Sequence, residues 1–245
     1  GCAALGLLAC SSTPSANSAT HEPNVAPKAT TPPAPAPPPQ FEEPLAVHMR
    51  DHQNQLTQAR DALIRGQLVD ATGALTWLAQ HREPKASALA RPFLERLHQH
   101  AQRALDSGDL RSASEAVGAL AATCGECHAA RGGGPKLEPS GFENLDEELT
   151  VATHMRGYFW ASEALWNALV ANRDELWTTG VATLSALEPP TRPRKLAPGF
   201  AAVQAWAKSA PTAANAAERG SAYGRLIVTC AKCHVEQGVD PGRTR

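Results

Sequence analysis

This sequence has few aromatic residues, no long apolar run and no excess of either charge. Aromatic side chains make up 5% of the 245 residues, and 23 Lys and Arg are balanced by 24 Asp and Glu, which gives a net charge of -1. Nucleic-acid binders and polybasic membrane-surface proteins carry a basic excess, so the composition argues against both classes. No uncharged apolar run reaches 18 residues, which excludes a bundle of transmembrane helices.

The first ten residues form a short apolar stretch that ends in a cysteine. We interpret residues 1–10 as the remnant of a secretory signal. The run Leu7-Leu8-Ala9-Cys10 resembles the lipobox of bacterial lipoproteins, in which a small residue precedes the cysteine that receives lipid. This resemblance implies a periplasmic, membrane-anchored lipoprotein with Cys10 as the lipidated thiol. A simple cleaved signal peptide is the alternative, and lipidation at Cys2 would leave an apolar segment inside the tether.

Proline is concentrated in the segment that follows. Ten of the 20 prolines lie in residues 1–44, and residues 11–41 show no apolar periodicity. Such a segment cannot bury a core and favours an extended polyproline II conformation. We expect residues 11–41 to be a disordered tether.

The remainder of the chain is an internal repeat with a period of 106 residues. Cys124 recurs as Cys230, and the triplet that begins at His48 recurs at His154, both 106 positions later. Two separate motifs that keep the same spacing twice indicate a tandem duplication. The predicted units are residues 42–141 and 142–245.

Each unit is predicted to contain four helices. In the first, apolar residues step by three and four along residues 45–63, and Gly66 ends that segment. Further helices are expected at Gln67–Gln80, Ala86–Asp106 and Asp109–Ala130, with Asp109 as the N-cap of the last. Strand-like alternation is absent, so the predicted fold class is all-α, with two tandem four-helix bundles.

Two copies of the motif Cys-x-x-Cys-His carry the chemistry. On a helix, residues i and i+3 share a face, so two thiols can add to the two vinyl groups along one haem edge. The His at i+4 then lies beneath the iron as its proximal ligand, which is the signature of c-type haem. The prediction is two haem c groups per chain, attached through Cys124 and Cys127 and through Cys230 and Cys233, with His128 and His234 as the proximal iron ligands.

Three other uses of these cysteines fit less well. A zinc site is unusual in an exported protein, and the repeat gives each cysteine pair its own unit. A thioredoxin-like redox pair needs a βαβ context, of which the sequence gives no sign. Structural disulfides would leave His128 and His234 unexplained.

The position of the motif at the end of each unit resembles the cytochrome c prime class of four-helix-bundle haem proteins. The resemblance covers about residues 42–240, and each unit here is shorter than expected for that class. It implies that the fourth helix carries the haem and that a residue of the first helix faces the distal side. In some members of the class that residue is a Met.

The distal ligands are expected on the first helix of each unit. The chain has only two methionines, Met49 and Met155, and they occupy equivalent positions on the predicted apolar seam that faces the fourth helix. A thioether is a soft neutral ligand that suits haem iron, so both are predicted as axial ligands. The alternative is bis-His ligation through the neighbouring residues His48 and His154, which are turned by about 100° around the helix.

Electron transfer is the function that these features predict. Two six-coordinate haems without an acid–base constellation indicate a non-enzymatic dihaem cytochrome that exchanges single electrons with redox proteins of the periplasm or membrane. If the methionines only fill the core, the resemblance favours binding of nitric oxide or carbon monoxide instead. A dihaem peroxidase would need one specialised open site, which the similarity of the units does not suggest. Nucleic acid is not an expected partner, and a homodimer is possible by analogy with the resembled class.

Overall fold

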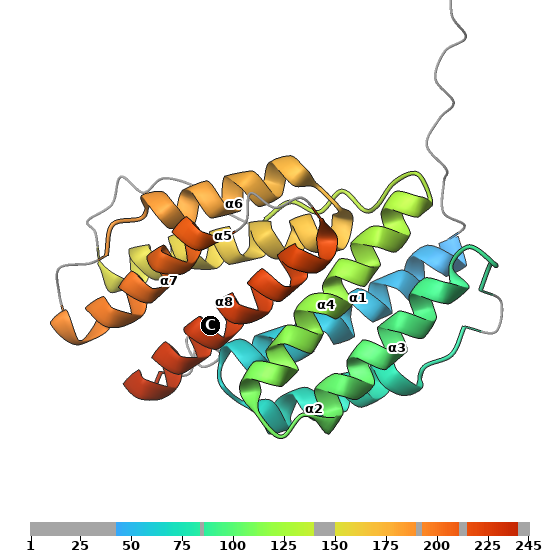
Figure 1. The fold of residues 1–245 in the computed structure, drawn as a ribbon, viewed down its shortest axis with the longest axis horizontal. Coiled ribbons are helices and arrows are strands. Elements are labelled where there is room, and N and C mark those ends of the chain that lie inside the picture. The colour runs from blue at the N-terminus through green and yellow to red at the C-terminus, as the bar shows by residue number, and fades with distance from the viewer. Residues whose placement is uncertain (1–42, 84–85, 140–149, 190–192, 211–214, 240–245) are drawn as a thin grey trace, which may run out of the picture. The chain divides into compact units, whose positions relative to one another are not determined.

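The chain forms eight α-helices in the residues that its computed structural model describes, which are 43–83, 86–139, 150–189, 193–210 and 215–239. No strand occurs within these ranges, which confirms the all-α fold class. No helix among them is long and apolar enough to cross a membrane. The helices, shown in Figure 1, are α1 (Glu43–Ile64), α2 (Leu68–Gln80), α3 (Arg91–Asp106), α4 (Leu110–Ala130), α5 (Val151–Ala171), α6 (Asp174–Ala186), α7 (Ala197–Ser209) and α8 (Ala216–Gln237).

The helices follow the sequence repeat closely. The first residues of α2 and α6, of α3 and α7, and of α4 and α8 are each separated by 106 positions. Helices α1 to α4 contact one another in chain order, with α4 returning to α1, and α5 to α8 do the same. The described helices nevertheless belong to one compact unit, with a single hydrophobic core that draws on both repeats.

Two helix starts show how local chemistry sets the boundaries. Asp109 is confirmed as the N-cap of α4, since its carboxylate accepts a hydrogen bond of 2.9 Å from the amide of Ser112. The third helix begins at Arg91 and not at Ala86 as expected. The Ser87 hydroxyl accepts from the Ala90 amide in a separate turn, and Pro92 is accommodated in the first turn of α3, where its missing N–H costs no hydrogen bond.

Several of the predicted segments lie outside the described residues. These are the signal remnant at 1–10 with Cys10, the tether at 11–41, and the boundary between the units at 141 and 142. They remain predictions.

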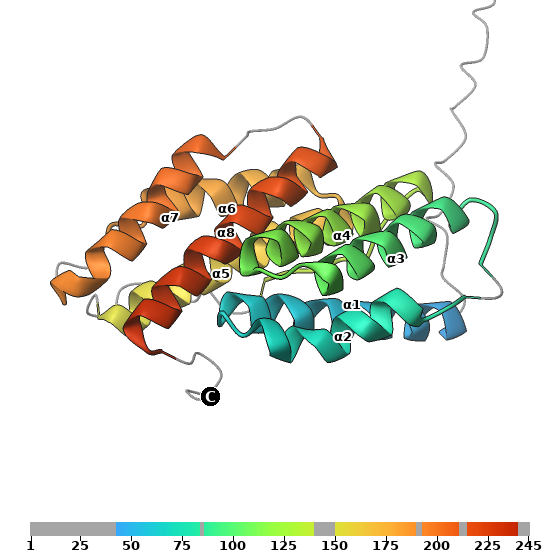
Figure 2. The same ribbon diagram turned by 60° about the horizontal axis from the view of Figure 1, so that its bottom comes forward.

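The two repeats are joined chiefly through α4 and α8, which lie side by side in Figures 1 and 2 and share the most extensive helix contact of the described chain. Glycine makes this approach possible. A Cβ on Gly220 would lie 2.7 Å from the backbone oxygen of Gly118, and one on Gly224 would lie 2.8 Å from that of Ser114. Gly118 and Gly224 are equivalent positions of the two repeats, so the contact is built symmetrically.

Substitution of Gly118 by Ala is expected to destabilise the fold by about 1–3 kcal/mol, because the new methyl group would collide with the backbone oxygen of Gly220. The matched control is Gly73→Ala on α2, where a Cβ meets nothing within 4 Å and helix propensity predicts a gain of up to about 1 kcal/mol. Urea unfolding of both variants measures the difference. Equal stability of the two would contradict the close α4–α8 contact.

A buried ion pair also connects the repeats. Arg60 of α1 is 2% exposed, lies 2.5 Å from the carboxylate of Glu163 on α5 and stacks over Trp166. Burial on its own would lower the pKa of Arg60, but the neighbouring Tyr223, Glu163 and Asp61 raise it above its usual value. The guanidinium therefore stays charged and holds α1 against α5.

Candidate haem sites

The four motif cysteines lie on the helices that join the repeats. Cys124 and Cys127 are on α4, Cys230 and Cys233 are on α8, and none of the four is in a disulfide. Burial raises the pKa of Cys124 and of Cys230 to about 12, so both thiols are protonated near pH 7. In this structure each pair therefore consists of two free thiols.

A cavity of about 310 Å³ lies beside the first motif. Its volume falls at the lower end of the range for ligand pockets, roughly 300–1,000 Å³. Leu56, Leu78, Phe93 and Leu97 give it a mainly apolar wall drawn from α1, α2 and α3. The side chains in its lining that can bind haem or iron are Met49, His52, Cys124, Cys127 and His128.

Each motif histidine is held by the opposite repeat. Nδ1 of His128 lies 2.6 Å from the carbonyl oxygen of Val170 on α5, and Nδ1 of His234 lies 2.9 Å from that of Ile64 on α1. A carbonyl can only accept, so Nδ1 carries the proton and Nε2 keeps its lone pair. This is the tautomer that a haem-ligating histidine needs, with a carbonyl fixing the ring orientation.

The ends of α1 and α5 supply these carbonyls. Carbonyl groups in the last turn of a helix lack an intrahelical partner, so Ile64 and Val170 can accept from a side chain. The turn that follows is the same in both repeats: Gly66 and Asn172 have positive φ angles of 77° and 54°. The two interactions therefore follow from one helix-end geometry that the duplication preserved.

Burial lowers the pKa of His128, and this effect outweighs the hydrogen bond to Val170, which raises it. The imidazole is therefore neutral near pH 7. Only the neutral form can donate a lone pair to a metal.

The two predicted distal residues of the first repeat, Met49 and His48, differ in whether they line the cavity. Met49 lines the cavity, as does His52 one turn later, whereas His48 is not among the lining residues. Instead, Nε2 of His48 lies 3.2 Å from the carboxylate of Glu83. Met49 and His128 therefore line the same cavity, whereas His48 does not.

The second repeat differs from the first on this side. Met155 is 37% exposed, whereas His154 is 4% exposed and its Nδ1 lies 2.9 Å from the carbonyl oxygen of Thr150. The two neighbouring side chains therefore differ in exposure, and adjacent helical residues are turned by about 100° from each other. The prediction that Met155 is an axial ligand stays a prediction.

Aromatic side chains pack between α5 and α7 in the second repeat. The ring of Phe200 on α7 packs against Tyr158, at 5.1 Å between centroids, and against His154, at 6.2 Å. Tyr158 replaces the His52 of the first repeat. The larger ring fills the space between α5 and α7, and Cys233 packs against the backbone of the neighbouring Gly199.

One group of polar side chains was not predicted from the sequence. His48, His52, His81 and Glu83 converge beside the first cavity, and the sequence pattern indicated no role for His81 or Glu83. The spacing of His48 and His52, one helical turn apart, was the available signal. His81 and Glu83 come from the end of α2 and the loop after it. Helical periodicity does not predict where such a loop places its side chains.

Comparison of the chain with models of known protein families, with curated proteins and with solved structures found no match.

Proposed function

We propose that this protein is a dihaem c-type cytochrome that carries single electrons between redox partners in the periplasm. The observation that carries the proposal is the symmetric fixing of His128 and His234 at the two Cys-x-x-Cys-His motifs. In each repeat the carbonyl contact leaves Nε2 as the free ligand atom on the helix that bears both thiols. When bound, each haem supplies an iron atom that changes its charge by one electron.

The surrounding residues are suited to hold such a group without catalysing a reaction. Cys124 and Cys127 attach the first haem and His128 orients its iron, while the apolar wall of the cavity excludes water. Besides the motif, the ionisable side chains in the lining of this cavity are Arg50 and His52.

The distal ligands that fit best differ between the repeats. Met49 is proposed for the first haem, because it lines the cavity together with His128. For the second haem we propose His154, because it is buried where Met155 is exposed. A Met ligand raises the reduction potential relative to His, so the two haems are expected to have different potentials.

Gas binding is the second candidate function, and the exposure of Met155 favours it at one haem. If neither His154 nor Met155 reaches the second iron, its distal side is open to nitric oxide or carbon monoxide. Such a protein would resemble the five-coordinate members of the cytochrome c prime class.

Removal of one cysteine pair tests the haem assignment. The unmodified protein is expected to carry two haems that resist acid-acetone extraction, and the variant with Cys124→Ala and Cys127→Ala is expected to carry one. Intact mass and haem absorbance per chain measure both numbers. The matched variant, Cys230→Ala with Cys233→Ala, is expected to lose the other haem, and retention of two covalent haems in either variant would contradict the proposal.

A further inference from the structure

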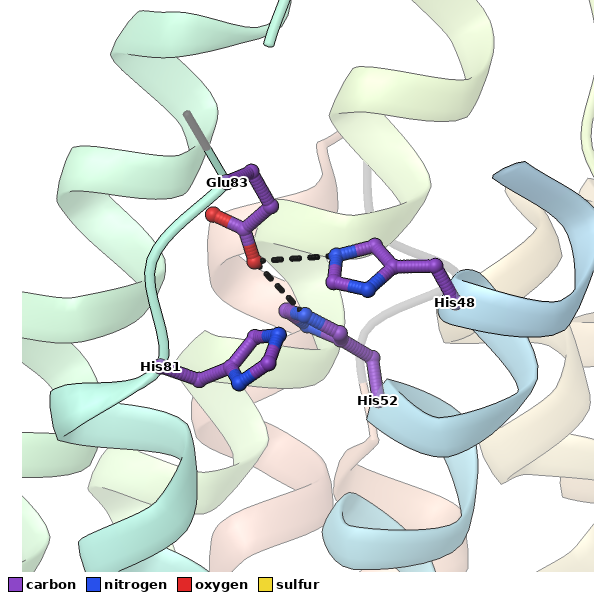
Figure 3. Close-up of side chains that lie close together, drawn as sticks. All are labelled: His48, His52, His81 and Glu83. Atoms are coloured by element: carbon purple, nitrogen blue, oxygen red, sulfur yellow. Dashed lines mark hydrogen bonds and ion pairs between the residues drawn. The ribbon is translucent and has the colours of Figure 1, made fainter. Parts of the chain in front are cut away.

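A second group of metal-ligand side chains lies next to the first cavity and outside the two motifs. His48 and His52 project from the same side of α1, His81 is the C-cap of α2, and Glu83 follows two residues later (Figure 3). The imidazole centroids of His48, His52 and His81 are 4.7–5.5 Å apart. One ligand atom from each of the four residues lies within 4.8 Å of every other.

The carboxylate of Glu83 is at the centre of the group. Its Oε1 lies 3.2 Å from Nε2 of His48 and 2.7 Å from Nε2 of His52, and its Oε2 lies 3.9 Å from Nε2 of His98. In the described part of the chain, its recorded charge partners are all imidazoles. Arg82, the nearest cation in sequence, directs its guanidinium to the carbonyls of Ala79 and His81 instead.

Hydrogen bonds within the group do not satisfy its nitrogen atoms. Nε2 of His52 and Nε2 of His98 are both buried and form no hydrogen bond of acceptable geometry, although each lies near the carboxylate. Their contacts with Glu83, at 2.7 Å for His52 and 3.9 Å for His98, are therefore ion-pair contacts without a well-aligned hydrogen bond. Buried polar atoms are usually hydrogen-bonded, and a metal ion bound by these nitrogens would satisfy them.

Three imidazoles and one carboxylate form a complete ligand set for zinc. Zinc binds four N, O or S ligands in a tetrahedron at about 2.0–2.2 Å, which places the donor atoms roughly 3.4 Å apart. The observed separations need only small side-chain rotations to reach that value. Calcium and magnesium prefer sites built from oxygen, which the three nitrogen donors disfavour.

Trp77 packs against two of the imidazole rings, those of His81 and His52. The indole of Trp77 stacks on His81 at 4.0 Å between centroids with the planes 13° apart, and it meets His52 edge-on at 5.1 Å. Such packing fixes the direction of the ligand atoms before an ion arrives, which is the role of outer contacts in metal sites.

The second repeat lacks this group, although it keeps the haem motif. The positions equivalent to His52, His81 and Glu83 are occupied by Tyr158, Leu187 and Pro189. The histidines are therefore not required by the bundle or by haem attachment, both of which are duplicated. They indicate a property of the first repeat alone.

We propose that His48, His52, His81 and Glu83 bind one divalent transition-metal ion of the zinc type per chain, with His98 close to the same carboxylate. The ion is distinct from the two haem irons. It also gives His48 a role other than distal ligation of the first haem.

Zinc titration of the full-length protein, purified with its covalently bound groups and stripped of loose metal by a chelator, tests the proposal. Calorimetry is expected to show one tight Zn²⁺ site per chain and no comparable site for Mg²⁺. Glu83→Gln and His81→Ala are expected to weaken the zinc affinity by about 100-fold or more, since loss of outer partners alone costs roughly 10–100-fold. His100→Ala, at a histidine of α3 outside the group, is the control and should bind as the unmodified protein does.

Zinc X-ray absorption identifies the ligands independently of folding effects. A first shell of nitrogen and oxygen at about 2.0–2.1 Å is expected. Sulfur at about 2.3 Å would assign the zinc to the cysteine pairs and overturn the proposal, as would absence of tight binding or unchanged affinity in Glu83→Gln. Haem content is measured on the same samples, so failure of the zinc site leaves the proposed electron-transfer function separately testable.

Discussion

The Met49→Ala variant is expected to bind carbon monoxide at one of its two haems, whereas the unmodified protein binds it at neither. Met49 lines the cavity that His128 faces, and the wall around it is mainly apolar. Loss of the thioether leaves one axial position without a protein ligand, so the first iron should become high-spin and its reduction potential should fall. Absorption spectra of the reduced protein with and without carbon monoxide measure the change.

The equivalent methionine provides the matched control. Met155 is exposed, so Met155→Ala is expected to leave both haems closed, and His154→Ala is expected to open the second. An opening of the second haem by Met155→Ala would show that α5 turns when haem binds and would contradict the assignment of His154. If Met49→Ala changes nothing and His48→Ala or His52→Ala opens the first haem, its distal ligand is a histidine, and that residue is lost from the proposed zinc site.

The Arg60→Ala variant is expected to lose about 3–5 kcal/mol of stability. Removal of one partner from a buried ion pair leaves the other charge uncompensated, and Glu163 would keep its carboxylate in the contact between α1 and α5. A loss of this size is a large part of the 5–15 kcal/mol typical of a domain. Urea unfolding monitored by circular dichroism gives the value.

Two further variants separate the charge effect from other causes. Arg111→Ala, at an exposed arginine of α4, is expected to change the stability by less than about 0.5 kcal/mol. Replacement of both charges, Arg60→Met with Glu163→Leu, is expected to recover most of the loss, because no charge is then left buried. If Arg60→Ala resembles Arg111→Ala, the ion pair does not hold the repeats together.

The loss of Arg60 should also affect the second haem. Ile64, whose carbonyl oxygen holds His234, lies one helical turn beyond Arg60 on α1. A looser α1 would weaken this contact before the helix unfolds. Arg60 thus stabilises the contact between the repeats, and through α1 it also helps to hold the ring of His234 in place.

The sequence predicted the helices well because their signals are local. Asp109 caps α4, Gly66 follows the end of α1, and the apolar steps of three and four mark which face of each helix is buried. The repeat spacing was equally accessible, because it needs only two motifs found twice. None of these signals depends on which helix lies opposite.

The contacts between the repeats could not be predicted in the same way. Periodicity identifies a buried face but not its partner, so the crossing of α4 and α8 at Gly118 and Gly220 was not anticipated. For the same reason, the sequence did not predict the contacts of His128 and His234 with the opposite repeat. The packing of Phe200 against Tyr158 and His154 was equally inaccessible, because it depends on which helices lie next to each other.

In the proposed electron carrier, two protein ligands hold each of the two irons. The absorption spectrum of the reduced, unmodified protein before and after addition of carbon monoxide tests this ligation. Two covalent, low-spin haems and an unchanged spectrum in the presence of the gas are expected. Rapid binding of carbon monoxide at either haem would contradict this ligation and would make gas binding the function of that site.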